Sequence, residues 1–243
     1  MFDVCIIGGG PAGLMAAETA ADNGLSVVII DAKSTFGRKF LMAGKSGLNI
    51  TKNEDRCEFL KHYFDAEQWL NPMIKGFDNE AIMKWVHSLG QEVFTGSSGH
   101  VFPKCMKASP LLRSWLKRLA DKGVVFYHNR RWVGWKDDLT VFETTSGAKF
   151  IQSNTTILAM GGASWSHLGS DGSWADILTK HGIDISPFQP SNMGFKIKWS
   201  DFMKPFFGTP IKSVRITSGK FSAIGEFVIS KKGIEGSGIY AAS

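Results

Sequence analysis

Cysteine is scarce in this chain of 243 residues, and the three cysteines (Cys5, Cys57 and Cys105) lie far apart in the sequence. An odd number of cysteines without a CxxC pair argues against a disulfide framework and a zinc cage, and it favours a reducing compartment, which we expect to be the cytoplasm. No two histidines have the spacing of metal ligands, so we expect no metal site. The GxSxG, HExxH and GxxxxGK[ST] motifs are also missing, so the sequence carries no hydrolase or P-loop pattern.

Long apolar segments are missing as well. No run of about 18 apolar residues occurs, so we expect no helix that spans a membrane. The opening residues Met1-Phe2-Asp3-Val4 lack a basic region before the apolar run, so we expect no secretory signal. Hydrophobic residues make up 43% and charged residues 21%, which is ordinary for a globular chain and excludes a disordered tail.

The net charge of +6 is concentrated in two basic stretches. Residues 32–52 contain five basic residues and no acidic residue, and residues 102–136 contain nine basic residues and one acidic residue. Such stretches can bind nucleic acid, an anionic membrane or an anionic small molecule, or they can be solvated surface. The second stretch includes a helix whose basic residues lie opposite its apolar face, so solvation explains most of it. The first is interleaved with glycines, which favours a backbone that closes around phosphate or a ring system.

The chain begins with a predicted strand, a glycine-rich turn, a helix and a second strand. Residues 2–7 and 26–30 are short apolar runs typical of buried parallel strands, and residues 11–23 are rich in alanine. The intervening turn, Gly8-Gly9-Gly10-Pro11-Ala12-Gly13, matches the G-x-G-x-x-G pattern of dinucleotide-binding folds. Asp31 follows the second strand, 21 residues after Gly10, where a carboxylate can bind ribose hydroxyl groups. We therefore predict a Rossmann-like α/β domain that seats a pyrophosphate at a helix N-terminus.

Further elements are predicted along the first 188 residues. Three helices are expected: one capped by Asp78 and closed by Gly90, one with Ser109 as its N-cap that ends at Gly123, and one around 173–181. The expected strands are a parallel strand at 124–127, a meander at 132–135, 141–145 and 149–151, and a buried strand at 155–159. Beyond Pro187 the pattern changes to strands with prolines. We place the domain boundary there.

FAD and NAD share the glycine fingerprint, and a second feature separates them. A β-meander followed by a strand that ends in Ala159-Met160-Gly161-Gly162 resembles the flavoprotein branch of the two-dinucleotide fold. Gly161 and Gly162 would let the backbone approach a dinucleotide at the carboxyl edge of the sheet. Read alone, the same glycine pair is equally consistent with an ordinary turn after a buried strand.

The segment after the second strand gives a more specific resemblance. Residues 37–51 read Gly-Arg-Lys-Phe-Leu-Met-Ala-Gly-Lys-Ser-Gly-Leu-Asn-Ile-Thr, and we expect a loop there. The segment resembles the G-[RK]-K-x-x-x-[SA]-G-x-x-x-x-N-[VIL]-T pattern of the YhiN/BaiN-like, or aminoacetone oxidase-like, family of FAD-dependent oxidoreductases. Residues 99–103, 169–173, 225–227 and 233–238 are similar to that family too. The resemblance therefore covers essentially the whole chain.

The resemblance implies a cofactor, FAD, and a set of residues that bind it. These residues are Gly8, Gly10, Pro11, Ala12 and Gly13 at the pyrophosphate, Asp31 and Ala32 at the adenosine ribose, Arg38 and Lys39 at phosphate or ribityl groups, Gly44, Gly47 and Asn49 on the flavin side, Trp132 at adenine, and Ala159, Gly161 and Gly162 at the sheet edge. No catalytic acid or base is assigned. Family members extend well past this length, so we expect a shortened chain.

The predicted architecture has a first domain at 1–188, which is a Rossmann-like, two-dinucleotide-binding FAD domain. This domain contains a β-meander and a helical insertion at about 53–100. An incomplete β-rich domain follows at 189–243. The predicted function is transfer of a hydride or electron pair between a small-molecule substrate and flavin, with NAD(P)H as a candidate donor. One alternative is an inactive nucleotide-binding fragment. A lesser alternative is a basic protein associated with RNA or DNA, although no nucleic-acid module is recognisable.

Overall fold

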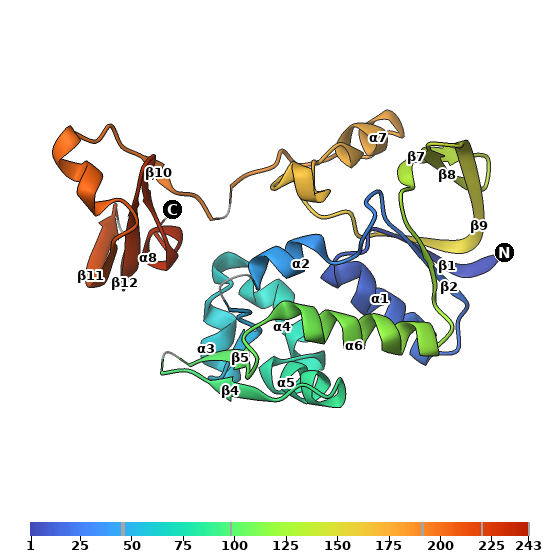
Figure 1. Cartoon of the computed structure of the whole chain (residues 1–243). Helices are drawn as coiled ribbons and strands as arrows, with labels where there is room; N and C mark the ends of the chain where they lie inside the picture. Colours follow the sequence, from blue (N-terminus) through green and yellow to red (C-terminus); the bar gives the residue numbers. More distant parts are fainter. Residues whose placement is uncertain (45–46, 98, 191, 220, 243) are drawn as a thin grey trace. The chain divides into compact units, whose positions relative to one another are not determined.

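The computed structural model describes residues 1–44, 47–97, 99–190, 192–219 and 221–242 (Figure 1). Lys45 and Ser46 of the basic glycine-spaced segment lie outside the described residues. The chain divides into a first unit, residues 1–185, and a second unit, residues 186–243. This division falls three residues before the domain boundary expected after residue 188.

The first unit is a mixture of strands and helices. Its described strands are β1 (Phe2–Ile7), β2 (Val27–Ile30), β3 (Thr51–Lys52), β4 (Val93–Thr95), β5 (His100–Pro103), β6 (Val125–Tyr127), β7 (Arg131–Lys136), β8 (Leu139–Thr144) and β9 (Gly147–Leu158). Its described helices are α1 (Pro11–Asp22), α2 (Arg38–Ala43), α3 (Arg56–Lys61), α4 (Glu67–Gly76), α5 (Asn79–Ser88), α6 (Ala108–Asp121) and α7 (Trp174–Lys180), with short 3-10 turns at Phe64–Ala66 and Ser166–Leu168.

The main sheet runs in the order β6-β2-β1-β9-β8-β7. Strands β6, β2, β1 and the second half of β9 are parallel, whereas β8 and β7 are antiparallel to their neighbours. This topology confirms the Rossmann-like fold with a β-meander. The sequence pattern predicted two separate strands at 149–151 and 155–159, and that prediction was wrong. Residues 147–152 pair with β8 and residues 153–158 pair with β1, so one continuous strand serves both partners.

Successive side chains of the buried strands point to opposite faces of the sheet, so a hydrophobic core forms on each face. On one face, Val4 and Ile6 of β1 pack with α1 and α6, including Trp115. On the other face, Cys5 and Ile7 pack with residues of the meander and α7. Figure 1 shows α6 running alongside α1, below the parallel strands. The sheet is therefore covered on both sides, as parallel strands require.

Two local predictions need correction. The segment after Gly37 is a short helix, α2, where a loop was expected, because Gly37 adopts the left-handed conformation (φ 66°) and the next six residues contain no glycine or proline. Helix α6 begins at Ala108 with Lys107 as its N-cap residue, so Ser109 lies inside the helix and makes no capping hydrogen bond. The predicted cap of α5 is confirmed, because Asp78 Oδ1 accepts a hydrogen bond of 2.9 Å from the Ala81 N–H.

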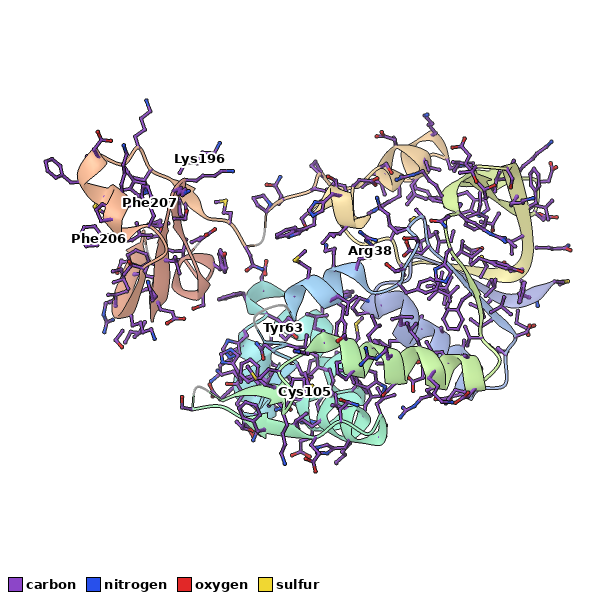
Figure 2. All side chains as sticks on the ribbon, in the orientation of Figure 1. Arg38, Tyr63, Cys105, Lys196, Phe206 and Phe207 are labelled. Atoms are coloured by element: carbon purple, nitrogen blue, oxygen red, sulfur yellow. The ribbon has the colours of Figure 1, made fainter. Side chains whose placement is uncertain are left out.

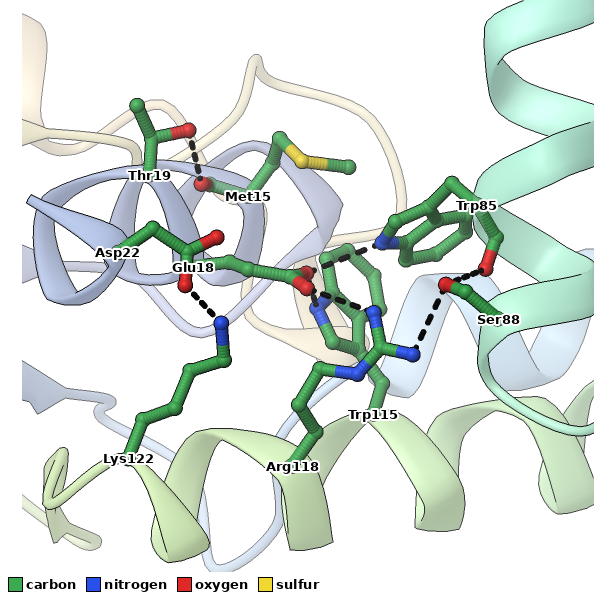
Figure 3. A network of polar contacts seen from close by, with 9 residues as sticks. All are labelled: Met15, Glu18, Thr19, Asp22, Trp85, Ser88, Trp115, Arg118 and Lys122. Atoms are coloured by element: carbon green, nitrogen blue, oxygen red, sulfur yellow. Dashed lines mark hydrogen bonds and ion pairs between the residues drawn. The ribbon is translucent and has the colours of Figure 1, made fainter.

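A buried carboxylate joins three helices of the first unit (Figure 3). Glu18 of α1 is 5% exposed, and its Oε2 accepts hydrogen bonds from the indole N–H groups of Trp85 (3.0 Å) and Trp115 (2.7 Å). Its Oε1 pairs with the Arg118 guanidinium at 2.9 Å, and that guanidinium also donates to Ser88 Oγ. Trp115 is 2% exposed and belongs to the core, and Trp85 is partly buried against that core. The network fixes α1 against α5 and α6 behind the glycine-rich turn.

The buried position of Cys5 leads to a labelling prediction. Burial raises the pKa of its thiol to about 12, so this thiol stays protonated and unreactive at about pH 8. Cys57 and Cys105 are exposed, and Cys105 is labelled in Figure 2. We expect iodoacetamide to modify these two residues in the native protein and to modify Cys5 only after denaturation, as read by peptide mass spectrometry. Equal native labelling of Cys5 and Cys57 would contradict the packing described for β1.

The second unit contains a sheet in the order β10-β13-β12-β11. Its described elements are β10 (Phe195–Lys196), a 3-10 helix (Asp201–Phe206), β11 (Pro210–Ser218), β12 (Phe221–Ser230), β13 (Gly233–Glu235) and α8 (Ser237–Tyr240). The antiparallel pairing of these strands confirms the extra β-rich part of the fold. Across both units, none of the described helices has the length and apolar character needed to cross a membrane.

Candidate functional site

A cavity of about 480 Å³ opens at the carboxyl edge of β1, β2 and β9 in the first unit. Eleven residues predicted to bind the cofactor line it: Gly8, Gly10, Pro11, Ala12, Asp31, Ala32, Arg38, Lys39, Trp132, Ala159 and Gly161. They come from four separate parts of the sequence, and the sheet topology brings them together. This edge is where open α/β sheets bind their ligands.

The other predicted residues lie outside the cavity lining. Gly13 packs inside the turn, because a Cβ there would collide with the Gly8 carbonyl oxygen. Gly44 lies at the end of α2 against Ala108, and Gly47 faces Met106. Asn49, Gly44, Gly47 and Gly162 do not line the cavity within the described residues. Their proposed contacts with the flavin side of the cofactor remain predictions.

The glycine-rich turn has the shape that a pyrophosphate needs. Added Cβ atoms at Gly8, Gly9 and Gly13 would collide with Ala159, Phe36 and Gly8, so these glycines let the turn pack against the protein itself. Gly10 differs, because a Cβ at that position meets nothing within 4 Å and the residue faces the cavity. Gly10 is also the N-cap of α1, whose first-turn N–H groups have no partner within the helix. The turn thus offers open space beside unpaired donors, which fits a dinucleotide diphosphate.

Asp31 is held at the edge of the cavity by two backbone donors. Its Oδ2 accepts a hydrogen bond from Gly9 N–H and its Oδ1 accepts one from Lys33 N–H, both at 2.8 Å. These bonds aim the carboxylate at the glycine-rich turn and leave lone pairs free, since each carboxylate oxygen can accept more than one hydrogen bond. The carboxylate therefore lines the same crevice as Gly10, as the proposed ribose contact requires.

Helix α2 brings two cations to the cavity wall. The Nε–H of Arg38 (labelled in Figure 2) is buried without a hydrogen-bond partner among the described residues, and its Nη1 lies 3.4 Å from Thr35 Oγ1. Lys39 Nζ lies 3.3 Å from Ser170 Oγ and 3.4 Å from both Ser164 oxygens. Neither cation has a carboxylate partner among the described ion pairs. Two uncompensated positive charges beside the turn favour an anionic ligand.

The opposite wall comes from the segment after β9. Trp174 donates its indole N–H to the Gly161 carbonyl at 2.8 Å, and Ser170 Oγ donates to the Gly162 carbonyl at 2.8 Å. Arg131 pairs with Asp171 at 3.1 Å. Burial by itself would raise the pKa of Asp171, but hydrogen bonds from Ser173 and the nearby Arg131 outweigh it and hold this pKa below its ordinary value. These contacts hold residues 161–174 against one another and against strand β7.

Several cavity residues were missed by the sequence reasoning. They are Ile7, Gly9, Ile30, Thr35, Gly37, Arg130, Arg131, Leu158, Met160, Leu168, Gly169, Ser170, Asp171, Ser173, Trp174 and Leu178. The run Gly169–Ser173 carried a usable signal, because it resembles the family pattern, but its side chains were not assigned a role. Arg130 and Arg131 were counted only within a basic stretch. The structure singles them out by their place beside the end of β6.

The chain was compared with known families and proteins. The sequence profile of the HI0933-like protein Rossmann domain family matches residues 2–238. A 3-dehydro-bile acid delta(4,6)-reductase from Clostridium scindens is 31% identical over 207 residues, which cover 84% of this chain and 50% of the relative. A digeranylgeranylglycerophospholipid reductase from Methanosarcina acetivorans is 30% identical over 105 residues, 43% of this chain and 24% of that protein.

Solved structures similar to this chain in fold include a fumarate reductase. The open conformation of a flavocytochrome c3 fumarate reductase has a TM-score of 0.55 and 16% identity, covering 87% of this chain and 47% of that one. The chain thus spans half or less of the length of each of these three proteins.

Proposed function

The chain belongs to the HI0933-like Rossmann domain family, and on that premise we propose that it binds FAD in the cavity of the first unit and acts as a flavoprotein oxidoreductase. The family match confirms the resemblance, the fold class and the FAD cofactor predicted from the sequence. Gly10 is the observation that carries the residue assignment, because it faces open space between an unpaired helix N-terminus and the carboxylate of Asp31. That arrangement suits an adenosine diphosphate group.

Each part of the cavity wall has a role in this proposal. The first-turn N–H groups of α1 bind the diphosphate, and Arg38 and Lys39 neutralise its charge. Asp31 accepts hydrogen bonds from the adenosine ribose, and Gly161 lets the backbone approach the cofactor. When bound, the flavin supplies the capacity to take up or release a hydride or an electron pair. The protein contributes binding, orientation and a positive local field.

The identities of the substrate and the electron donor are further parts of the proposal. We propose a small organic substrate and NAD(P)H as the donor. The Clostridium scindens relative is named as a reductase of a 3-dehydro-bile acid, which makes reduction the first reaction to test. The cytoplasm, predicted from the cysteine pattern, stays a prediction.

Nucleic acid is a weaker proposal for the second basic stretch, since many of its charges are already paired. The described pairs are Lys104–Glu92, Lys117–Asp121, Arg118–Glu18, Lys122–Asp22 and Arg131–Asp171. Internal pairing lowers the charge available to phosphates along a nucleic-acid backbone.

Reconstitution with FAD tests the proposed function. We expect the purified chain, incubated with FAD and desalted, to keep the flavin absorption bands and to quench flavin fluorescence. Retained FAD together with NAD(P)H oxidation supports the oxidoreductase. Retained FAD without turnover of any tested donor favours the nucleotide-binding fragment. A colourless protein that takes up no flavin contradicts the proposal.

A further inference from the structure

Arg130 is a further cation in the cavity wall, beside Arg38 and Lys39. It follows β6 and lines the cavity, and it takes part in none of the ion pairs among the described residues. Its guanidinium carbon instead lies 3.6 Å from the centre of the Tyr127 ring. One face of the guanidinium plane is thus covered by an aromatic ring, which holds the side chain in a defined orientation.

Backbone hydrogen bonds place this stacked pair next to Asp31. The Arg130 N–H donates to the Asp31 carbonyl at 3.0 Å, and the Asp31 N–H donates to the Tyr127 carbonyl at 3.0 Å. The Asn129 N–H donates to the Lys33 carbonyl at 3.1 Å. The chain from Tyr127 to Arg130 therefore runs directly beside the residue proposed to bind the adenosine ribose.

We infer that Arg130, supported by Tyr127, is the platform on which the adenine ring of the bound dinucleotide stacks. The inference rests on the proposed function, because it takes the ribose to be at Asp31. In this proposal the base follows the ribose next to Asp31, and Arg130 lines the same cavity with its backbone N–H bonded to the Asp31 carbonyl. The guanidinium face opposite Tyr127 stacks on the purine, giving a ring–guanidinium–base sandwich.

A different role for Arg130 would be to neutralise phosphate. Arg38 and Lys39 already supply two positive charges from α2, whereas Arg130 adjoins Asp31 at the end of β6. The two roles have different chemical requirements. A phosphate contact depends mainly on charge, which lysine also carries, and weakens with salt, whereas stacking needs the guanidinium plane and is much less sensitive to salt.

The test compares nucleotide affinity among variants of the full chain. FAD and ADP binding would be measured by fluorescence quenching and calorimetry, at low and high salt, for Arg130→Met, Arg130→Lys and Tyr127→Phe. The matched control is Arg113→Met, which removes an exposed arginine of the same basic stretch outside the cavity lining. Far-UV circular dichroism would verify that each variant is folded.

We expect Arg130→Met to lower the affinity for FAD and for ADP by about tenfold, and Arg130→Lys to lower both affinities almost as much. The loss of affinity should be similar at both salt concentrations. Tyr127→Phe keeps the ring and Arg113→Met lies elsewhere, so both should bind like the wild type. Wild-type affinity in Arg130→Lys, or a loss that disappears at high salt, would overturn the stacking role in favour of phosphate neutralisation. Normal binding by Arg130→Met overturns the inference and leaves the proposed function standing, whereas a wild-type chain that binds neither FAD nor ADP overturns both.

Discussion

Gly10→Asp is expected to abolish FAD binding while the protein stays folded. Gly10 has extended backbone angles (φ −81°, ψ −180°) that any residue can adopt, and an added Cβ meets nothing within 4 Å. Aspartate is a favourable N-cap, so α1 should be at least as stable as before. The new carboxylate would occupy the space proposed for the diphosphate. Two unit charges about 4 Å apart repel by about 4 kcal/mol at an effective dielectric constant near 20, or roughly a thousandfold in Kd.

The matched control for this variant is Gly76→Asp. It makes the same change in charge at the end of α4, where an added Cβ also meets open space. FAD affinity would be measured by titration of flavin fluorescence, and folding by thermal denaturation. We expect Gly76→Asp to bind FAD normally. If Gly10→Asp binds FAD within about tenfold of the wild type, the diphosphate does not lie at this turn.

Glu18→Ala should cause a large loss of stability. The change removes the acceptor of two indole N–H groups and the ion-pair partner of Arg118, which keeps its hydrogen bond to Ser88. Removing one member of a buried ion pair costs about 3–5 kcal/mol. We expect a decrease of at least about 3 kcal/mol in the free energy of unfolding, measured by urea denaturation of the full chain with circular dichroism.

Two further variants separate the network from a general effect of charge. Glu18→Gln keeps an oxygen that can accept from both indoles but loses the charge facing Arg118, so we expect an intermediate loss of about 1–2 kcal/mol. Glu80→Ala removes the carboxylate of an exposed pair with Lys84 and should cost less than about 0.5 kcal/mol. Equal losses in Glu18→Ala and Glu80→Ala would show that the buried contacts contribute little.

The parts of the fold that were predictable depend on neighbours close in sequence. The apolar run from Phe2 to Ile7, the glycine-rich turn and Asp31 all lie within one βαβ unit, so their pattern carries the geometry directly. The cap at Asp78 is equally local, because its oxygen bonds to a backbone N–H three residues away. Most of the residues predicted at this end of the cofactor accordingly line the cavity.

The parts that escaped prediction depend on contacts between distant residues. Glu18 meets Trp115 and Arg118 about a hundred residues along the chain, and nothing near Glu18 in sequence indicates those partners. Arg130 gains its place through its own backbone bond to residue 31 and the bond of Asn129 to residue 33, so a count of basic residues could not single it out. The continuity of β9 was missed because the polar residues between its two apolar parts resemble a turn.

The double pairing of β9 also restricts where this domain can change length during evolution. One inserted residue between positions 147 and 158 would slip the register against β8 or β1 and turn alternate side chains to the opposite face. Such a slip would move the backbone that leads to Gly161. Insertions should therefore accumulate in the connection between β7 and β8, around Asp137, where the chain reverses and no third strand depends on its length.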